Sequence, residues 1–210
     1  MQTGACKYGI VVFIFLLFLT GICFGQEVQV FYAEGGDFTH TSGGLRVAYQ
    51  SEKDGRKILT LGRDDIIQAG PDSFVELRIN PGRIRIRIAE NTSLAFNGAG
   101  SGSLSFSILY GRVRLSTLGY WSAGEGAGSV SIRSGTAEAV FTGGDAGIDF
   151  IVNEDPYLAR GEPVFRVYSF SGTVGLTPSA RPETLTAAPE FQVRQFESLS
   201  IETRNPLFYI

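Results

Sequence analysis

The chain contains one histidine, His40, within the polar run of residues 39–44. One histidine cannot supply a multi-histidine metal site, and in a serine triad it would have to be the general base. The sequence has no Gly-x-Ser-x-Gly motif, which presents the nucleophilic serine in one large class of hydrolases. We therefore expect His40 to lie in a solvent-facing loop and to take no part in catalysis.

Two clusters of carboxylates could bind Ca²⁺ or act together on a glycosidic bond. One is Asp64 with Asp65, and the other is Asp145 with Asp149 in a glycine-rich segment. Neither has the alternating spacing of an EF-hand or the nonapeptide repeat of a calcium-binding β-roll. Because aspartate next to glycine usually caps backbone N–H groups, we interpret both clusters as turn residues. The sequence predicts no metal site and no cofactor.

A basic row of Arg83, Arg85 and Arg87 could bind an anion. These arginines alternate with isoleucines, so their side chains share one face of an expected strand. The whole chain is acidic, with 18 Lys and Arg against 21 Asp and Glu. A strand face neutralised by acidic neighbours is therefore the simpler interpretation, and anion binding is the alternative.

Aromatic residues beside glycine-rich segments are candidates for a surface that binds a glycan or a peptide. Tyr110, Tyr120 and Trp121 flank such segments, and Tyr157 lies in another expected loop. Neighbouring residues on a strand point to opposite faces, so Tyr120 and Trp121 cannot both be buried in one core. Tyr110, Tyr120 and Trp121, together with the basic row, are the candidate binding residues.

Alternation of apolar and polar residues predicts the strands that carry these side chains. The clearest case is residues 74–79 and 84–88, joined by Asn80-Pro81-Gly82-Arg83, which suits a type II turn. This turn would pair aliphatic residues on one face: Val75 with Ile88, Leu77 with Ile86 and Ile79 with Ile84. On the other face Glu76 would oppose Arg87. Arg78 would oppose Arg85, which is unfavourable unless an acidic group lies beside them.

A glycine followed by alternating apolar residues recurs along the chain. It occurs at Gly82-Arg-Ile-Arg-Ile, Gly111-Arg-Val-Arg-Leu and Gly172-Thr-Val-Gly-Leu, and more weakly at Gly135-Thr-Ala-Glu-Ala-Val. Such recurrence is typical of stacked β units that share a core. We predict an all-β fold, a β-solenoid-like or folded-over sheet built from stacked hairpins, with a β-sandwich as the alternative.

Segments rich in glycine, serine, alanine or proline divide the predicted strands. We expect surface loops at residues 97–103, 119–128 and 154–163. Residues 26–61 are expected to form an N-terminal β segment that packs on a main domain at 62–177. A proline-containing linker at 178–190 would lead to one closing strand at 191–202 and a tail that ends at residue 210.

Residues 1–25 have the features of an export signal: a positive charge at Lys7, an apolar run over 10–22, and small residues at 23 and 25. Cleavage before Gln26 would remove both cysteines and leave a thiol-free chain with a net charge of −4. An uncleaved anchor is one alternative, although the run is short for a membrane-spanning helix. Acylation of Cys23 is another, and Ile22 disfavours it. The predicted location is periplasmic or otherwise extracytoplasmic, or at the inner membrane if the anchor is retained.

Several segments occur in the order found in one known family. They are Asp65-Ile-Ile-Gln-Ala-Gly-Pro-Asp-Ser73, the Pro81-Gly82 turn, Asn91-Thr-Ser-Leu94, Leu109-Tyr-Gly-Arg-Val113 and Gly147-Ile-Asp-Phe-Ile-Val152. In this order they resemble the FecR domain, a family of extracytoplasmic β modules. The resemblance covers about residues 62–152, and residues 164–176 would form the last β unit of the domain. Asp64, Ala69 and Ile148 depart from the family's preferred glycine, threonine and threonine, so this would be a divergent member.

The resemblance implies a module without catalytic residues. In the regulators of the family, the domain follows a cytoplasmic segment that controls a sigma factor, and only a few residues precede the apolar run here, so we expect no such control. We predict a non-catalytic envelope module that binds or scaffolds an envelope protein or a peptidoglycan-type glycan. A carboxylate-based glycan hydrolase and a small outer-membrane β-barrel are the alternatives. The acidic charge without an extended basic stripe argues against nucleic acid as a partner.

Overall fold

The computed structural model describes residues 27–51, 59–80, 84–100, 102–117, 128–135, 137–152, 163–178 and 190–202. Several predicted features lie outside these ranges. They are the expected signal, the Pro81-Gly82 turn, residues 119–127 and 154–162 of two expected loops, residues 179–189 of the expected linker, and the tail after residue 202. The described residues form sixteen strands and confirm the predicted all-β fold. No described segment is a helix long and apolar enough to cross a membrane.

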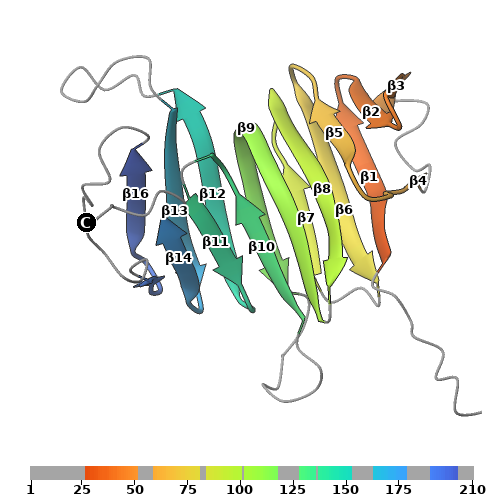
Figure 1. The fold of residues 1–210 in the computed structure, drawn as a ribbon. Helices are drawn as coiled ribbons and strands as arrows, with labels where there is room; N and C mark the ends of the chain where they lie inside the picture. The colour runs from red at the N-terminus through yellow and green to blue at the C-terminus, as the bar shows by residue number, and fades with distance from the viewer. Residues whose placement is uncertain are drawn as a thin grey trace, which may run out of the picture.

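The strands form one open, mixed sheet that folds over on itself into two facing layers (Figure 1). The first layer contains, in spatial order, β4 (Leu59–Thr60), β1 (Glu27–Gly35), β6 (Ser73–Asn80), β7 (Ile84–Ile88), the second part of β9 (Ser103–Thr117), β12 (Asp145–Val152), β13 (Pro163–Ser171) and β16 (Ser198–Glu202). The second layer contains β3 (Leu45–Tyr49), β2 (Phe38–Ser42), β5 (Asp65–Ala69), β8 (Thr92–Gly100), the first part of β9, β10 (Ser129–Arg133), β11 (Ala137–Phe141), β14 (Val174–Pro178) and β15 (Phe191–Val193). Every described pairing is antiparallel except that of β9 with β10.

Strand β9 joins the two layers. Its first part pairs with β8 and β10, and from Gly111 onward it pairs with β12 and then β7. Gly111 has a φ of +102°, and a Cβ at this position would collide with Thr92. The Thr92 hydroxyl also accepts the backbone N–H of Arg112 at 2.9 Å. The bend between the layers therefore depends on a residue without a side chain.

Crossings between the two layers lie at two opposite edges of the sheet. In the first part of the chain, the crossings β1–β2, β5–β6 and β7–β8 lie at the edge where Gly111 bends β9. Backbone bonds tie them together, from Gly70 N to Asp37 O at 3.0 Å and from Asn91 N to Gly70 O at 3.1 Å. In the second part, the crossings β11–β12 and β13–β14 lie at the far edge, where Thr117 N donates to Gly144 O at 2.9 Å.

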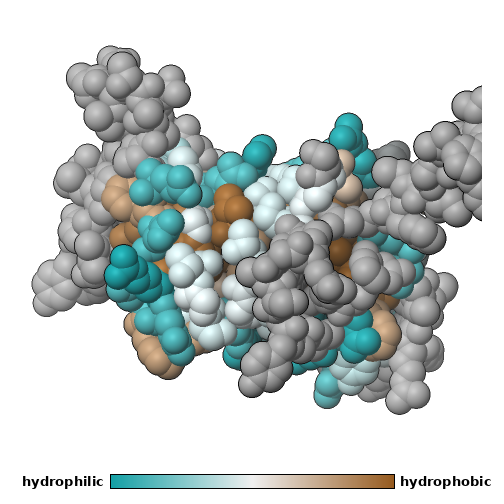
Figure 2. Space-filling model, turned by 90° about the horizontal axis from the view of Figure 1, so that it is seen from below, coloured by the Kyte–Doolittle hydropathy of each residue, from teal (hydrophilic) through white to brown (hydrophobic). Residues whose placement is uncertain are grey.

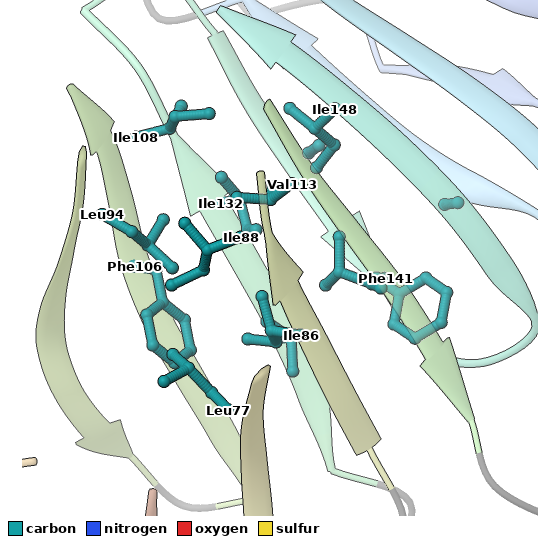
Figure 3. Packing of buried hydrophobic residues seen from close by; sticks show 14 of the residues in the cluster. Leu77, Ile86, Ile88, Leu94, Phe106, Ile108, Val113, Ile132, Phe141 and Ile148 are labelled. Atoms are coloured by element: carbon teal, nitrogen blue, oxygen red, sulfur yellow. The ribbon is translucent and has the colours of Figure 1, made fainter. Parts of the chain in front are cut away.

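A continuous apolar core fills the space between the layers. Inward-facing residues of β6 and β7 meet those of β8, β9, β10 and β11, as Figure 3 shows for Leu77, Ile86, Leu94, Phe106 and Ile132. All of these are at most 1% exposed. Seen from below, brown apolar residues lie in a band between teal hydrophilic ones (Figure 2). Alternation along each strand thus sends one set of side chains inward and the other to solvent.

The predicted register of β6 and β7 is confirmed. Ile79 pairs with Ile84, Leu77 with Ile86 and Val75 with Ile88, and Arg78 lies opposite Arg85. The recurrent glycine motif also has a structural meaning, because the segments after Gly82 and Gly111 pair as β7 and β9. The segments after Gly135 and Gly172 pair as β11 and β14.

The loop predicted at residues 97–103 is wrong for most of its length. Residues 97–100 continue β8, and residue 103 already begins β9. Gly98, with a φ of +126°, lies at an irregularity in the pairing, and the Asn97 amide donates to Ser107 at 2.9 Å across the strand pair. The small residues in this segment allow the two strands to pair closely around a bulge. Composition alone does not distinguish such a segment from a loop.

The single closing strand predicted at residues 191–202 is also wrong. The segment forms β15, which pairs with β14, and β16, which pairs with β13 in the other layer. Phe196, with a φ of 65°, turns the chain between them, and the Glu197 carboxylate accepts the backbone N–H of Arg194 at 2.8 Å. A phenylalanine in this left-handed conformation carries no turn signal in sequence.

Candidate functional site

The solvent-facing side of the first layer carries a group of arginines on neighbouring strands. They are Arg78 on β6, Arg85 and Arg87 on β7, Arg112 and Arg114 on β9, and Arg166 on β13. Each alternates with an inward-facing apolar residue, so the same pattern that builds the core brings them to one surface. Arg87 lies directly opposite Arg114. Arg83 lies outside the described residues.

Glu76 neutralises part of this surface. Its carboxylate lies 3.0 Å from Arg78 Nε, 3.2 Å from Arg85 Nε and 3.5 Å from Arg87 Nε, and its side chain is only 8% exposed. This is the acidic group that the opposed Arg78 and Arg85 required. The Nε atoms of Arg85 and Arg87 are buried and have no partner in hydrogen-bond geometry among the described residues. One carboxylate thus serves three guanidinium groups without satisfying them all.

A hollow of about 520 Å³ lies on the same surface, beside Arg87. Its lining comes from five strands of the first layer and includes Phe74, Arg112, Arg114, Asp149, Tyr168 and Phe170. Gly147 also lines it, and a Cβ built there would lie 3.4 Å from the Phe170 ring and 3.5 Å from the Tyr168 ring. Because Gly147 has no side chain, the sheet is hollowed where β12 crosses this face.

Two aromatic side chains border the hollow from β13. Tyr168 lies opposite Gly147, and the pairing of β12 with β13 shifts at Asp145, next to Phe170. The Phe170 side chain is 44% exposed, and its ring centroid lies 5.0 Å from the guanidinium carbon of Arg114. The Tyr168 hydroxyl donates to Asp149 at 3.2 Å. The hollow therefore combines exposed ring surface with charged groups.

The charges that line the hollow are predominantly positive. Among the described lining residues, three arginines, Arg87, Arg112 and Arg114, accompany one carboxylate, that of Asp149, whereas the whole chain has a net charge of −3. Arg114 Nε donates to Asp145 at 2.8 Å, and this hydrogen bond raises the pKa of Arg114. Arg112 Nε lies 3.9 Å from Asp149, too far for a hydrogen bond. Arg87 Nε and Arg112 Nε thus lie near carboxylates without forming hydrogen bonds to them, in contrast to Arg114 Nε.

Tyr110 lies on the other side of the molecule. It is 41% exposed on the outer face of the second layer and borders a second hollow with Arg46 and Gln68. The Gln68 amide donates to the Tyr110 hydroxyl and accepts a hydrogen bond from Arg46 at 3.1 Å. The structure therefore does not bring Tyr110 together with Arg85 and Arg87. Tyr120, Trp121 and Tyr157 lie outside the described residues.

The prediction of a solvent-facing loop at His40 is wrong. His40 lies on β2, is 8% exposed and points between the layers, where its Nε2 donates to Asp65 at 2.8 Å. Burial would raise the pKa of Asp65, but hydrogen bonds from Ser42, His40 and the backbone N–H of Gly62 outweigh it and lower the pKa. His40 therefore joins the β2 strand to the start of β5 through a polar contact inside the fold.

The two aspartate clusters differ from each other. Asp64 has a φ of 67° and Asp65 accepts the Gly62 N–H at 2.8 Å, which confirms turn chemistry there. Asp145 and Asp149 instead lie on β12, so their interpretation as turn residues is wrong. Within the described ranges, no three His, Cys, Asp or Glu side chains are grouped in a way that could hold a metal ion.

Sequence reasoning missed most of the hollow. Arg112, Arg114, Tyr168 and Phe170 were not among the candidate residues, although each alternates with a buried residue in the printed sequence. That alternation identifies outward-facing side chains. It does not reveal that β7, β9, β12 and β13 are neighbours, which requires pairing between residues as far apart in the chain as Gly111 and Phe150.

No family model matches the chain, and no curated protein sequence matches it. Two crystal structures of a proposed anti-sigma factor from Parabacteroides distasonis, at 2.50 and 1.65 Å resolution, are structurally similar. Both superpose with a TM-score of 0.49, at 14% and 13% sequence identity. The match covers 69% of this chain and 57% of each of those chains, so this chain spans a little over half the length of the proteins it matches.

Proposed function

We propose that this chain is a non-catalytic binding module of the bacterial cell envelope that holds cell-wall glycan in the hollow of the first layer. The observation that carries the proposal is the hollow of about 520 Å³, bordered by the exposed ring of Phe170 and the half-buried ring of Tyr168. Its volume suits one or two sugar rings, since small-ligand sites commonly measure about 300–1,000 Å³. A protein partner would instead be expected to need a flatter surface of about 800 Å² on each side.

The sequence supports an extracytoplasmic, FecR-like role. The features of residues 1–25 favour export, and the order of segments over residues 62–152 resembles the FecR domain. Binding without catalysis is favoured over glycan hydrolysis because Asp149 is the one carboxylate among the described residues that line the hollow. Glycosidases of the common kind use two facing carboxyl groups.

Co-sedimentation of the purified protein with peptidoglycan sacculi tests the proposal. We expect the wild-type protein to sediment with sacculi and Phe170→Ala to lose most of this binding, because Phe170 offers its exposed ring at the hollow. Phe196→Ala is the matched control, since Phe196 is 83% exposed and lies in the turn between β15 and β16.

A second variant tests the hollow by filling it. Gly147→Val introduces a residue that favours the strand conformation, but the valine side chain would project toward Tyr168 and Phe170. We expect it to lose sacculus binding while keeping a strand-dominated far-ultraviolet spectrum. Sedimentation of this folded variant at the wild-type level would contradict the proposal.

A further inference from the structure

We propose that the hollow recognises the free carboxylate of an acidic sugar in peptide-free cell-wall glycan, through Arg87 and Arg112. This inference rests on the glycan-binding function proposed above. It adds the requirement that the glycan carries a negative charge, and it names the two side chains that would bind that charge.

The arrangement of arginines and acids favours an added anion. Acidic groups lie on the strands that flank β7 and β9, with Glu76 on β6 and Asp145 and Asp149 on β12. The outward-facing charges described on β7 and β9 are arginines alone: Arg85, Arg87, Arg112 and Arg114. Like charges on adjacent strands repel each other, and a bound carboxylate between them would relieve that repulsion.

Arg87 has a buried donor without a partner. Its Nε is inaccessible to solvent and lies 3.5 Å from Glu76, outside hydrogen-bond geometry, and Glu76 is shared with Arg78 and Arg85. Burying a polar group without a hydrogen bond is unfavourable. This Nε is closed to a ligand, but the Arg87 side chain as a whole is 37% exposed, and its exposed part can meet a ligand carboxylate in the hollow, because guanidinium and carboxylate groups match in charge and geometry.

Arg112 offers the second contact. Its side chain is 63% exposed, and Ala89, which directly follows β7 and whose backbone N–H bonds to Arg112 O at 3.1 Å, has only a small side chain beside it. The rings of Tyr168 and Phe170 lie across the hollow on β13, and Phe74 lies on β6. A sugar ring could therefore pack against an aromatic ring while its acidic substituent reaches Arg87 and Arg112.

Two disaccharides test the inference. N-acetylglucosaminyl-N-acetylmuramic acid carries a free lactyl carboxylate, and chitobiose has the same backbone without it. By titration calorimetry we expect the acidic disaccharide to bind about tenfold or more tightly, which corresponds to about 1.4 kcal/mol. This preference should weaken as salt is added. Equal affinities for the two sugars would overturn the inference and leave the proposed function standing.

Charge-removing variants assign the contact. Arg87→Gln and Arg112→Gln should each lower the affinity for the acidic disaccharide more than that for chitobiose, so that the preference for the acidic sugar shrinks. Arg133→Gln is the matched control, because Arg133 pairs with Glu138 at 2.9 Å on the second layer. A loss of affinity for both sugars alike, or for neither, would overturn the assignment. If neither sugar binds and sacculi do not retain the protein, the proposed function itself fails.

Discussion

Glu76 is the central acidic residue among the arginines on the outer face of the first layer. A single carboxylate, 8% exposed, lies within 3.5 Å of three arginine Nε atoms. Removing one arginine leaves Glu76 with two partners, so single arginine substitutions on this face should be tolerated. If the proposed function holds, stability and ligand binding should therefore be separable on this face.

The opposite faces of β7 should differ sharply in their tolerance of substitution. Ile86→Asp would place a charge among fully buried aliphatic side chains and cost on the order of several kcal/mol of unfolding free energy. Arg85→Ser should cost less than about 1 kcal/mol, because Glu76 keeps Arg78 and Arg87. Chemical denaturation of both variants checks this. Equal midpoints would contradict the register.

Asp65 should make the stability of the fold depend on acid. Its pKa in the folded chain is lowered from 3.8, so the folded state binds a proton less readily than the unfolded state. The stability from ionised Asp65 is therefore present above about pH 4 and is lost as the pH falls through the lowered pKa. Urea midpoints between about pH 6 and about pH 3 should fall less steeply in Asp65→Asn than in the wild type. Parallel curves would argue against this contribution.

His40 illustrates what sequence does not reveal about one residue. The run of residues 39–44 is polar and ends in two glycines, which favours a loop. In the structure, Thr39 and Thr41 face outward on β2 while Phe38 and His40 face inward, and the turn begins only at Gly43. His40 is accommodated because Asp65, 25 residues later, supplies a buried acceptor.

At the scale of elements, the bend in β9 should be the least replaceable backbone feature. Gly111→Ala adds a Cβ that collides with Thr92, at a φ that side chains rarely adopt. We expect a loss of at least about 3 kcal/mol. Gly135→Ala is the control, because no atom lies within 4 Å of its added Cβ, and it should change stability by less than about 1 kcal/mol. Thermal melts compare the two, and similar melting temperatures would contradict the role of Gly111.

Strands with strict alternation were the most predictable elements. Residues 75–79 and 84–88 alternate without exception, and both their pairing and their inward face follow from the sequence. The β15–β16 segment was not predictable, because its turn uses a positive φ at Phe196 and its two strands find partners in different layers. The local pattern of apolar and polar residues specifies which residues form strands. Which strands pair with each other depends on segments far apart in the sequence.

At the scale of the whole molecule, one core should give one unfolding transition. Buried residues from Val28 on β1 to Leu199 on β16 belong to a single cluster. We expect calorimetric and van't Hoff enthalpies of unfolding to agree, as in two-state proteins. Adding a chelator should leave the melting temperature unchanged, since the described residues hold no cluster of metal ligands. Two separated transitions would show that the parts of the chain before and after β9 unfold independently.

The bend in β9 also bears on the order in which the chain folds. Hairpins β6–β7 and β8–β9 join neighbouring segments, and the pairing of β7 with β9 unites them within residues 73–117. A contact such as Val28 with Ile79 closes a much longer loop, so forming it early costs more chain entropy for the same stabilisation. We therefore expect the nucleus to form around Gly111, with β1 and the strands after β10 adding later on either side. The N-terminal strand, although made first, would be among the last to find its place.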